Sequence, residues 1–237
     1  MLRSLFPSIV GIVLLAVTGG PSLVAGAGHA FEVGRLESGV RPAPVAEDCG
    51  ELLINADESY ENAYAWNGFA VAPPDWSAFA EFFSGQVTVC ALVFDLTQIG
   101  LQADETLDAY VWDDAGGEPG PVVSVVTEVA PGPVAYWPEM SRHVVPMAAS
   151  PSGEAWWAGL WSAWPFQEDA AWFVGADLNG PGGTPKVKVA PDLGYTTGWN
   201  DVSLVWGPTQ AMGIGVEHLT TTPTSDSSWG DVKSLFR

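Results

Sequence analysis

Short apolar segments separated by turn-forming residues are the feature that most limits how this chain can fold. From residue 86 to residue 219, runs rich in Val and aromatic side chains alternate with clusters of Gly, Pro, Asn and Asp. Such runs predict β-strands, because β-branched and aromatic residues favour strands and the turn residues end them. No segment combines a helical period with the length of a stable helix. The sequence therefore predicts an all-β fold.

Nine segments carry the strongest strand pattern. They are 86–96, 106–114, 121–130, 142–148, 154–164, 170–178, 185–190, 201–207 and 211–219. One segment, 73–83 (PPDWSAFAEFF), is expected to hold a short turn of helix. Many short strands without intervening helices indicate a single domain with a two-sheet antiparallel sandwich, jelly-roll-like in its architecture.

The N-terminus has the pattern of a secretory signal peptide over residues 1–27. Arg3 precedes an apolar run from Ile9 to Val17, and the small residues at 25–27 form a cleavage site. Residues 19–21 (Gly-Gly-Pro) end the apolar run at about 15 residues, and an uncleaved anchor would need about 20 to span a bilayer. We therefore expect a secreted or cell-surface protein with no membrane insertion after cleavage.

The remaining chain divides by composition into four parts. Residues 28–48 have no clear period and contain RPAP, which predicts a linker or an extended lead-in. The β-sandwich domain is expected to occupy residues 49–219. A Thr/Ser/Pro-rich linker follows at 220–228, and a separate C-terminal tip at 229–237 ends the chain.

The tip combines aromatic and basic residues in a chain that is otherwise strongly acidic. Trp229, Leu235 and Phe236 supply apolar anchors, and Lys233 and Arg237 supply positive charge for an acidic docking site. We expect export or attachment machinery to recognise this tip. The alternative is a tail that docks as a short helix on its own sandwich.

Charge and composition restrict the partners. The formal net charge is −20, and the acidic residues are dispersed along the chain. Such a charge opposes binding to nucleic acid and to anionic lipid. With 47% hydrophobic residues and 12 Trp, the chain has enough apolar surface to fold and is not a disordered acidic tail.

The chain has two cysteines, Cys49 and Cys90. In an exported protein a lone pair predicts one disulfide, and two buried free thiols are the alternative. Cys90 lies in a predicted strand, and Cys49 lies just before the domain begins. The bridge would therefore attach the N-terminal segment to the sheet.

No catalytic motif is present, so we expect a protein that is not an enzyme and has no cofactor. The sequence has no G-x-S-x-G, H-E-x-x-H, C-x-x-C or P-loop pattern. A glycosidase would need only two nearby carboxylates, and 28 acidic residues do not single out a pair.

Two weak metal patterns remain. His143 and His218 are predicted on strands and would bind a metal only if they met across a sheet. Asp177 and Asn179 precede Gly180 in a predicted loop, where oxygen ligands would hold a structural calcium ion. The alternative for these residues is a plain turn, because Asx residues beside glycine commonly form turns.

Alternation along the strands predicts where the aromatic side chains point. In 106–114 (TLDAYVWDD), the small and apolar residues at 107, 109 and 111 share one face, so Tyr110 and Trp112 are expected to be exposed on the other. In 154–164, Trp156 and Trp157 alternate in the same way, so one of them is expected on the outer face of its sheet. The alternative is that loops cover these rings.

Several longer segments together carry a resemblance. They are ESYENAYAWNG, VAPPDWSAFAEFF, YVWDDAGGEPGPVV, WAGLWSAWP, VGADLNGPGG and GYTTGWNDVSLVWGPTQAMGIGVEH. Over residues 51–219 this pattern resembles uncharacterised secreted β-sandwich modules of bacteria, and the WGDVKSLFR ending is similar to short tails of other exported proteins. The resemblance implies the sandwich fold and an exported location, and it implies no activity.

These observations favour a non-enzymatic extracellular module. Its expected role is to bind a glycan or a surface partner through an aromatic platform of Tyr110, Trp112, Trp156 and Trp157. The first alternative is a structural or adhesion protein without a small ligand. The second is a hydrolase that acts on polysaccharide.

Overall fold

The fold is built almost entirely from β-strands. The computed structural model describes residues 30–33, 38–41, 49–66, 76–101, 105–162, 164 and 171–220. The strands are β1 (Ala30–Glu32), β2 (Ser38–Arg41), β3 (Glu51–Ile54), β4 (Ser59–Tyr60), β5 (Asn62–Trp66), β6 (Phe79–Ser84), β7 (Val87–Ile99), β8 (Leu107–Asp114), β9 (Pro119–Val129), β10 (Ala135–Tyr136), β11 (Met140–Ala149), β12 (Ala155–Trp161), β13 (Ala171–Asp177), β14 (Lys186–Val189), β15 (Gly198–Asp201), β16 (Ala211–Met212) and β17 (Ile214–Thr220). Within the described ranges, α1 (Val202–Trp206) is the only helix.

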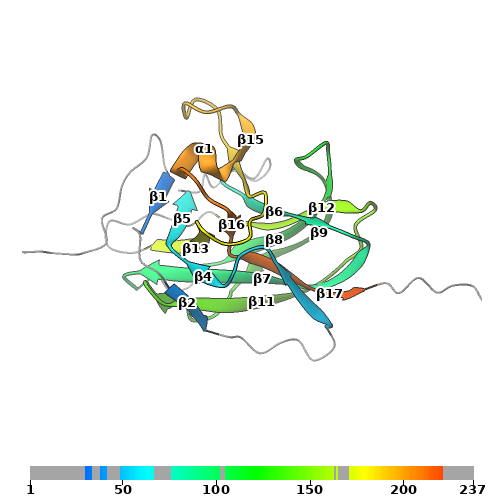
Figure 1. The fold of residues 1–237 in the computed structure, drawn as a ribbon, viewed down its shortest axis with the longest axis horizontal. Coiled ribbons are helices and arrows are strands. Elements are labelled where there is room, and N and C mark those ends of the chain that lie inside the picture. Colours follow the sequence, from blue (N-terminus) through cyan, green and yellow to red (C-terminus); the bar gives the residue numbers. More distant parts are fainter. Residues whose placement is uncertain are drawn as a thin grey trace, which may run out of the picture.

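The described strands form two sheets (Figure 1). The larger sheet has eleven strands in the order β1-β5-β13-β7-β11-β2-β4, with β3, β10, β16 and β17 attached to its members. The smaller sheet has six strands in the order β15-β14-β6-β12-β8-β9. Neighbouring strands are antiparallel except for two short parallel pairs, β10 with β7 and β2 with β11. The predicted two-sheet antiparallel sandwich is confirmed.

Alternate residues of both sheets form the main apolar core. The core side chains from three central strands include Leu92, Phe94, Leu96, Leu107, Ala109, Val111, Trp156, Ala158 and Leu160. All of them are at most 1% exposed. Burial of each large apolar side chain contributes about 1.5–3 kcal/mol, so this alternation is the main source of stability. The predicted inward face of β8 is therefore correct.

Strand β7 is covered on both faces. It pairs with β11 along one edge and with β13 and β17 along the other. Its second face carries Asp95, which is 0% exposed and accepts two hydrogen bonds from the Arg142 guanidinium, at 2.9 and 2.8 Å, and one from the Tyr60 hydroxyl at 2.7 Å. Burial and the neighbouring Asp95 raise the pKa of Tyr60 well above its usual value. The segment around β4 thus closes over the outer face of the larger sheet.

A disulfide joins Cys49 to Cys90, with their Cα atoms 6.0 Å apart, and confirms the predicted pairing. Cys90 lies in β7, and Cys49 precedes β3, which pairs with β17. Within 28–48, described residues form β1 beside β5 and β2 beside β11. The bridge attaches the start of the domain to the central strand of the larger sheet.

Two expected elements are wrong. The predicted strand over 201–207 is helix α1, which lies with β15 at one end of the molecule (Figure 1). Val202 and Trp206 pack on the core at helical spacing, whereas Leu204, the inward residue of a strand pattern, is 63% exposed. The helical turn expected in 73–83 is also wrong for its described part, because β6 begins at Phe79 and pairs with β12 and β14.

Candidate functional site

The four aromatic residues predicted to form a platform are buried. Tyr110 and Trp112 are 7% and 5% exposed, so their predicted exposure is wrong. Trp156 lies in the main core. Tyr110, Trp112 and Trp157 lie together on the opposite face of the smaller sheet. The alternation pointed Tyr110 and Trp112 to the correct face, but neighbouring side chains cover these rings.

Ring packing explains the burial of this outer aromatic cluster, which consists of Ala80, Tyr110, Trp112 and Trp157 with Phe82, Trp161 and Trp199 against them. Tyr110 and Trp112 stack with their centroids 4.9 Å apart and their planes 3° apart. Trp199 from β15 meets Trp112 edge-on at 5.7 Å. The Trp157 indole donates a hydrogen bond to Asp114 at 2.8 Å. Each ring covers part of its neighbour, so Tyr110, Trp112 and Trp157 leave little ring surface for a sugar.

The Asp177 and Asn179 pair forms a turn. Asp177 is 0% exposed, and its carboxylate accepts backbone N–H groups from Asn179, Gly180 and Asp57 at 2.9, 2.6 and 2.9 Å. The Asn179 amide donates to Glu61 at 2.9 Å. In the described part of the chain, no three His, Cys, Asp or Glu residues are grouped to hold a metal ion. Both side chains therefore take part in the turn, and the calcium hypothesis for them stays a prediction.

The two strand histidines are far apart. His143 on β11 lies opposite Phe94, and His218 on β17 lies opposite Val89, on the two different edges of β7. That register separates them by about 10 Å across the sheet and about 16 Å along it. They do not form the metal pair considered from the sequence.

His143 has a structural role. Its Nδ1 lies 2.8 Å from the Pro131 carbonyl, and its Nε2 lies 2.8 Å from the Ser141 hydroxyl. A carbonyl only accepts, so Nδ1 carries the proton and Nε2 accepts from Ser141. Burial lowers the pKa of His143, which favours this neutral ring.

The Tyr136 cleft lies beside β10 and is the larger of two candidate sites. It has a volume of about 510 Å³ and is lined by Pro133, Val134, Ala135, Tyr136, Trp137, Pro138, Glu139 and Ser141. Tyr136 is 51% exposed and is the only aromatic residue among the large apolar side chains that are exposed in the described ranges. The cleft therefore presents the accessible ring that the predicted platform lacks.

Hydrogen bonds to β7 hold the loop of the Tyr136 cleft. The Gln98 amide donates to Val134 O at 2.6 Å, and the Thr97 hydroxyl donates to Glu139 O at 2.8 Å. The backbone N–H of Trp137 donates to the backbone carbonyl of Gln98 at 2.9 Å. These contacts attach both ends and the middle of the loop to one rigid strand, so the Tyr136 ring is presented on a fixed backbone.

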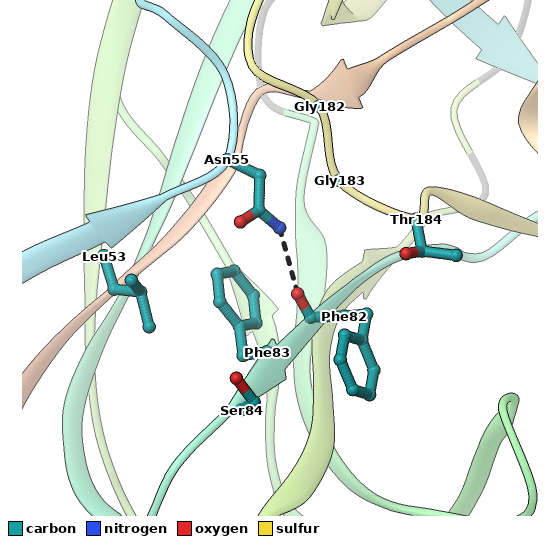
Figure 2. Close-up of a pocket in the computed structure, with 8 residues that line it drawn as sticks. All are labelled: Leu53, Asn55, Phe82, Phe83, Ser84, Gly182, Gly183 and Thr184. Carbon is teal, nitrogen blue, oxygen red and sulfur yellow. Dashed lines mark hydrogen bonds between the residues drawn. The ribbon is translucent and has the colours of Figure 1, made fainter.

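The Asn55 cleft is smaller and lies where β3, β6 and the loop before β14 meet (Figure 2). Its volume is about 240 Å³, and it is lined by Leu53, Asn55, Phe82, Phe83, Ser84, Gly182, Gly183 and Thr184. The Asn55 Nδ2 donates to Phe82 O at 2.9 Å and to Glu81 Oε2 at 3.0 Å. The amide oxygen of Asn55 consequently points away from Phe82 (Figure 2).

Glu81 lies behind the Asn55 cleft and links the two sheets. It is 0% exposed, and its Oε1 accepts the Met212 N–H of the larger sheet at 2.7 Å. Burial raises the pKa of Glu81 from 4.5 to about 7. A Cβ atom at Gly183 would clash with the Glu81 carboxylate, so only glycine lets the loop pass so close.

Sequence reasoning missed the residues of both clefts. Tyr136 follows the turn sequence PGP at 131–133 in a gap between two predicted strands, and an aromatic pair in such a loop is a usable signal. Glu81 interrupts the aromatic run FAEFF, which marks a carboxyl among core residues. Asn55 has no comparable signal, because its partners are distant in the chain.

No protein-family model matches this sequence, and no curated protein and no solved structure shows significant similarity to it. Among the described residues, no helix has the length and apolar character needed to cross a membrane. The signal peptide, the linker beyond Thr220 and the tip residues Trp229, Lys233, Phe236 and Arg237 lie outside the described residues. Their predicted roles stay predictions.

Proposed function

We propose that this chain is a secreted, non-enzymatic β-sandwich module that binds a neutral glycan in the Tyr136 cleft. The exposed Tyr136 ring is the observation that carries the proposal. Sugar rings have C–H faces that pack against aromatic rings, and one such contact contributes about 1 kcal/mol beyond the buried area. We therefore expect weak binding to a single site and stronger retention on a polymer that offers many.

The volume and rigidity of the Tyr136 cleft support this role. Its volume of about 510 Å³ lies within the range of roughly 300–1,000 Å³ found for small-molecule sites. A loop already held by Thr97 and Gln98 loses little entropy when a ligand binds. Glu139 is exposed in the same cleft and is an acceptor of the kind that sugar hydroxyls use.

Charge and cysteine chemistry support the ligand class and the location. A net charge of −20 disfavours acidic polysaccharides and leaves neutral ones as the expected ligands. The Cys49–Cys90 disulfide fits an oxidising, extracellular compartment, in agreement with the predicted signal peptide.

Affinity electrophoresis through gels that contain neutral polysaccharides tests the proposal. The wild-type protein and Y136F, which keeps the ring, should be retarded by at least one polymer. Y136A should migrate freely and keep its melting temperature, because a half-exposed ring adds little to the core. The proposal is wrong if no neutral polymer retards the wild type, or if Y136A is retarded equally.

A structural or adhesion role is the second candidate, and strand β9 favours it. This strand ends the smaller sheet, and Val122 and Val125 on it are 51% and 41% exposed. Residues 119–127 carry no charge in an otherwise acidic chain. An exposed, uncharged edge strand can pair with the same strand of a second copy of the protein. Sedimentation of the wild type and of V122K/V125K over a range of concentrations separates the candidates, because only an adhesion edge would self-associate and lose that property on substitution.

A further inference from the structure

We propose that the Asn55 cleft is a second binding site, which accepts one neutral ring bearing hydroxyl groups, such as a single monosaccharide unit. The Asn55 cleft and the Tyr136 cleft share no lining residue, so this proposal does not depend on the first. It assigns a ligand class to a part of the sandwich that the proposed function leaves unused.

A fixed hydrogen-bond acceptor is the first element of this site. The hydrogen bonds of the Asn55 side chain use its NH₂ group, which donates to Phe82 O and to Glu81 Oε2. An amide whose donors are engaged presents its oxygen in one direction only. Figure 2 shows that oxygen turned away from Phe82. Asn55 is therefore oriented before a ligand arrives, and its oxygen suits a hydroxyl donor.

Glu81 acts here as a positioning residue. Its carboxylate is fully buried, so a ligand cannot touch it. It holds Asn55 at 3.0 Å, and it is itself held by the Met212 N–H at 2.7 Å and by the Thr184 N–H at 3.4 Å. One carboxyl thus connects three segments that border the cleft. This arrangement fixes the relative positions of Asn55 and the loop that carries Thr184.

The remaining lining supplies what a small sugar ring needs. Leu53 and Phe82 are partly buried and provide an apolar wall for C–H groups. Ser84, at the end of β6, and Thr184, in the loop before β14, are exposed and place two hydroxyls on the same cleft. A volume of about 240 Å³ is below the usual range for drug-sized ligands, which limits the occupant to about one ring.

Charge selects a neutral ligand at the Asn55 cleft. No Lys or Arg is among its lining residues, so an acidic group would meet no positive partner. The Glu81 carboxyl directly behind Asn55 would repel an anion whenever it is ionised. A uronic acid is therefore expected to bind more weakly than the neutral sugar of the same ring shape.

Saturation-transfer and titration NMR of the full secreted chain tests this site with the methyl glycosides of glucose, galactose and mannose, and with methyl glucuronide as the charged counterpart. At least one neutral glycoside should bind, and methyl glucuronide should bind more weakly. N55L should reduce the affinity about tenfold through the loss of one hydrogen bond. T184V, which removes an exposed hydroxyl and preserves the shape, should reduce it several-fold even if N55L fails to fold.

L204A is the control, because Leu204 is exposed on helix α1 and lines neither cleft, and its affinity for the glycoside should equal that of the wild type. Three outcomes would overturn the proposal. No neutral glycoside binds, methyl glucuronide binds with equal affinity, or T184V and any folded N55L keep the full affinity of the wild type. Complete loss of glycoside binding in Y136A, with full affinity in N55L and T184V, would also overturn it, because the ligand would then occupy only the Tyr136 cleft. A failure of the Tyr136 proposal on polysaccharide gels leaves these outcomes unchanged.

Discussion

Replacing Glu81 by glutamine tests whether one buried carboxyl makes the stability of this fold depend on pH. Glu81 is 0% exposed, and burial raises its pKa from 4.5 to about 7. An acid with a raised pKa in the folded protein binds its proton more tightly there than in the unfolded chain. Its contribution to stability is therefore complete below about pH 4.5, falls as the pH rises, and is lost above about pH 7.

The size of this effect follows from the pKa shift. Each pKa unit corresponds to about 1.4 kcal/mol, so a rise from 4.5 to about 7 corresponds to about 3 kcal/mol of stability lost across that window. Glutamine does not ionise, so E81Q should lack the loss. The amide of glutamine places an NH₂ group beside the Asn55 donor, at a cost of about 1–3 kcal/mol. That cost is the same at every pH and cancels in a comparison between two pH values.

Urea unfolding followed by tryptophan fluorescence measures the difference. The unfolding free energy of E81Q minus that of the wild type should be about 3 kcal/mol larger at about pH 8 than at about pH 4, so the variant gains relative stability as the pH rises. E118Q removes one acid from an exposed turn and controls for net charge, and its difference should change little. His143 is present in all three proteins, so its own titration cancels. If the unfolding free energies of wild type and E81Q change in parallel between about pH 4 and about pH 8, the reasoning is refuted.

Three further substitutions test the fold. R142M should lower the unfolding free energy by about 3–5 kcal/mol, because it removes both guanidinium hydrogen bonds from the buried Asp95. A loss below about 1 kcal/mol would contradict a stabilising role of this buried pair. C49S/C90S should lower the unfolding free energy by about 4 kcal/mol, because the disulfide joins residues 41 positions apart. An unchanged melting curve would contradict this contribution. W112A should lower the unfolding free energy by about 3–5 kcal/mol and leave glycan retention unchanged, because the ring is buried. A W112A protein that is as stable as the wild type but no longer binds would support the platform hypothesis.

Local sequence pattern predicted nine of the seventeen described strands and missed β1 to β6, β10 and β15. Eight of the nine predicted strand segments contain observed strands, and only 201–207 is a helix. The inward faces of β8 and β12 also follow from alternation, because side chains of a strand point to opposite faces in turn. Cys49 and Cys90 were the only cysteines available to pair. These features depend on neighbours in the chain or on composition, so the sequence contains them directly.

The candidate sites were predicted less well. The sequence indicated the face on which Tyr110 and Trp112 lie, but their burial depends on ring stacking and on Trp199 from a distant strand. The Asn55 cleft joins segments separated by more than a hundred residues. The Glu81 carboxyl behind it accepts a hydrogen bond from Met212, which is 131 residues away from Glu81. Alternation along one strand has no information about such partners.

The sequence by itself determined the all-β class, the alternation that separates core from outer face, and the disulfide, because each depends on local pattern or on residue count. Only the tertiary structure decided which outward rings are covered, where helix α1 replaces a strand, and that Glu81 is buried with a pKa of about 7. The physical reason is that burial is a property of the space between elements. Whether Trp112 or Tyr136 meets solvent depends on which distant segments pack against it, and the pattern within its own strand or loop does not specify those segments.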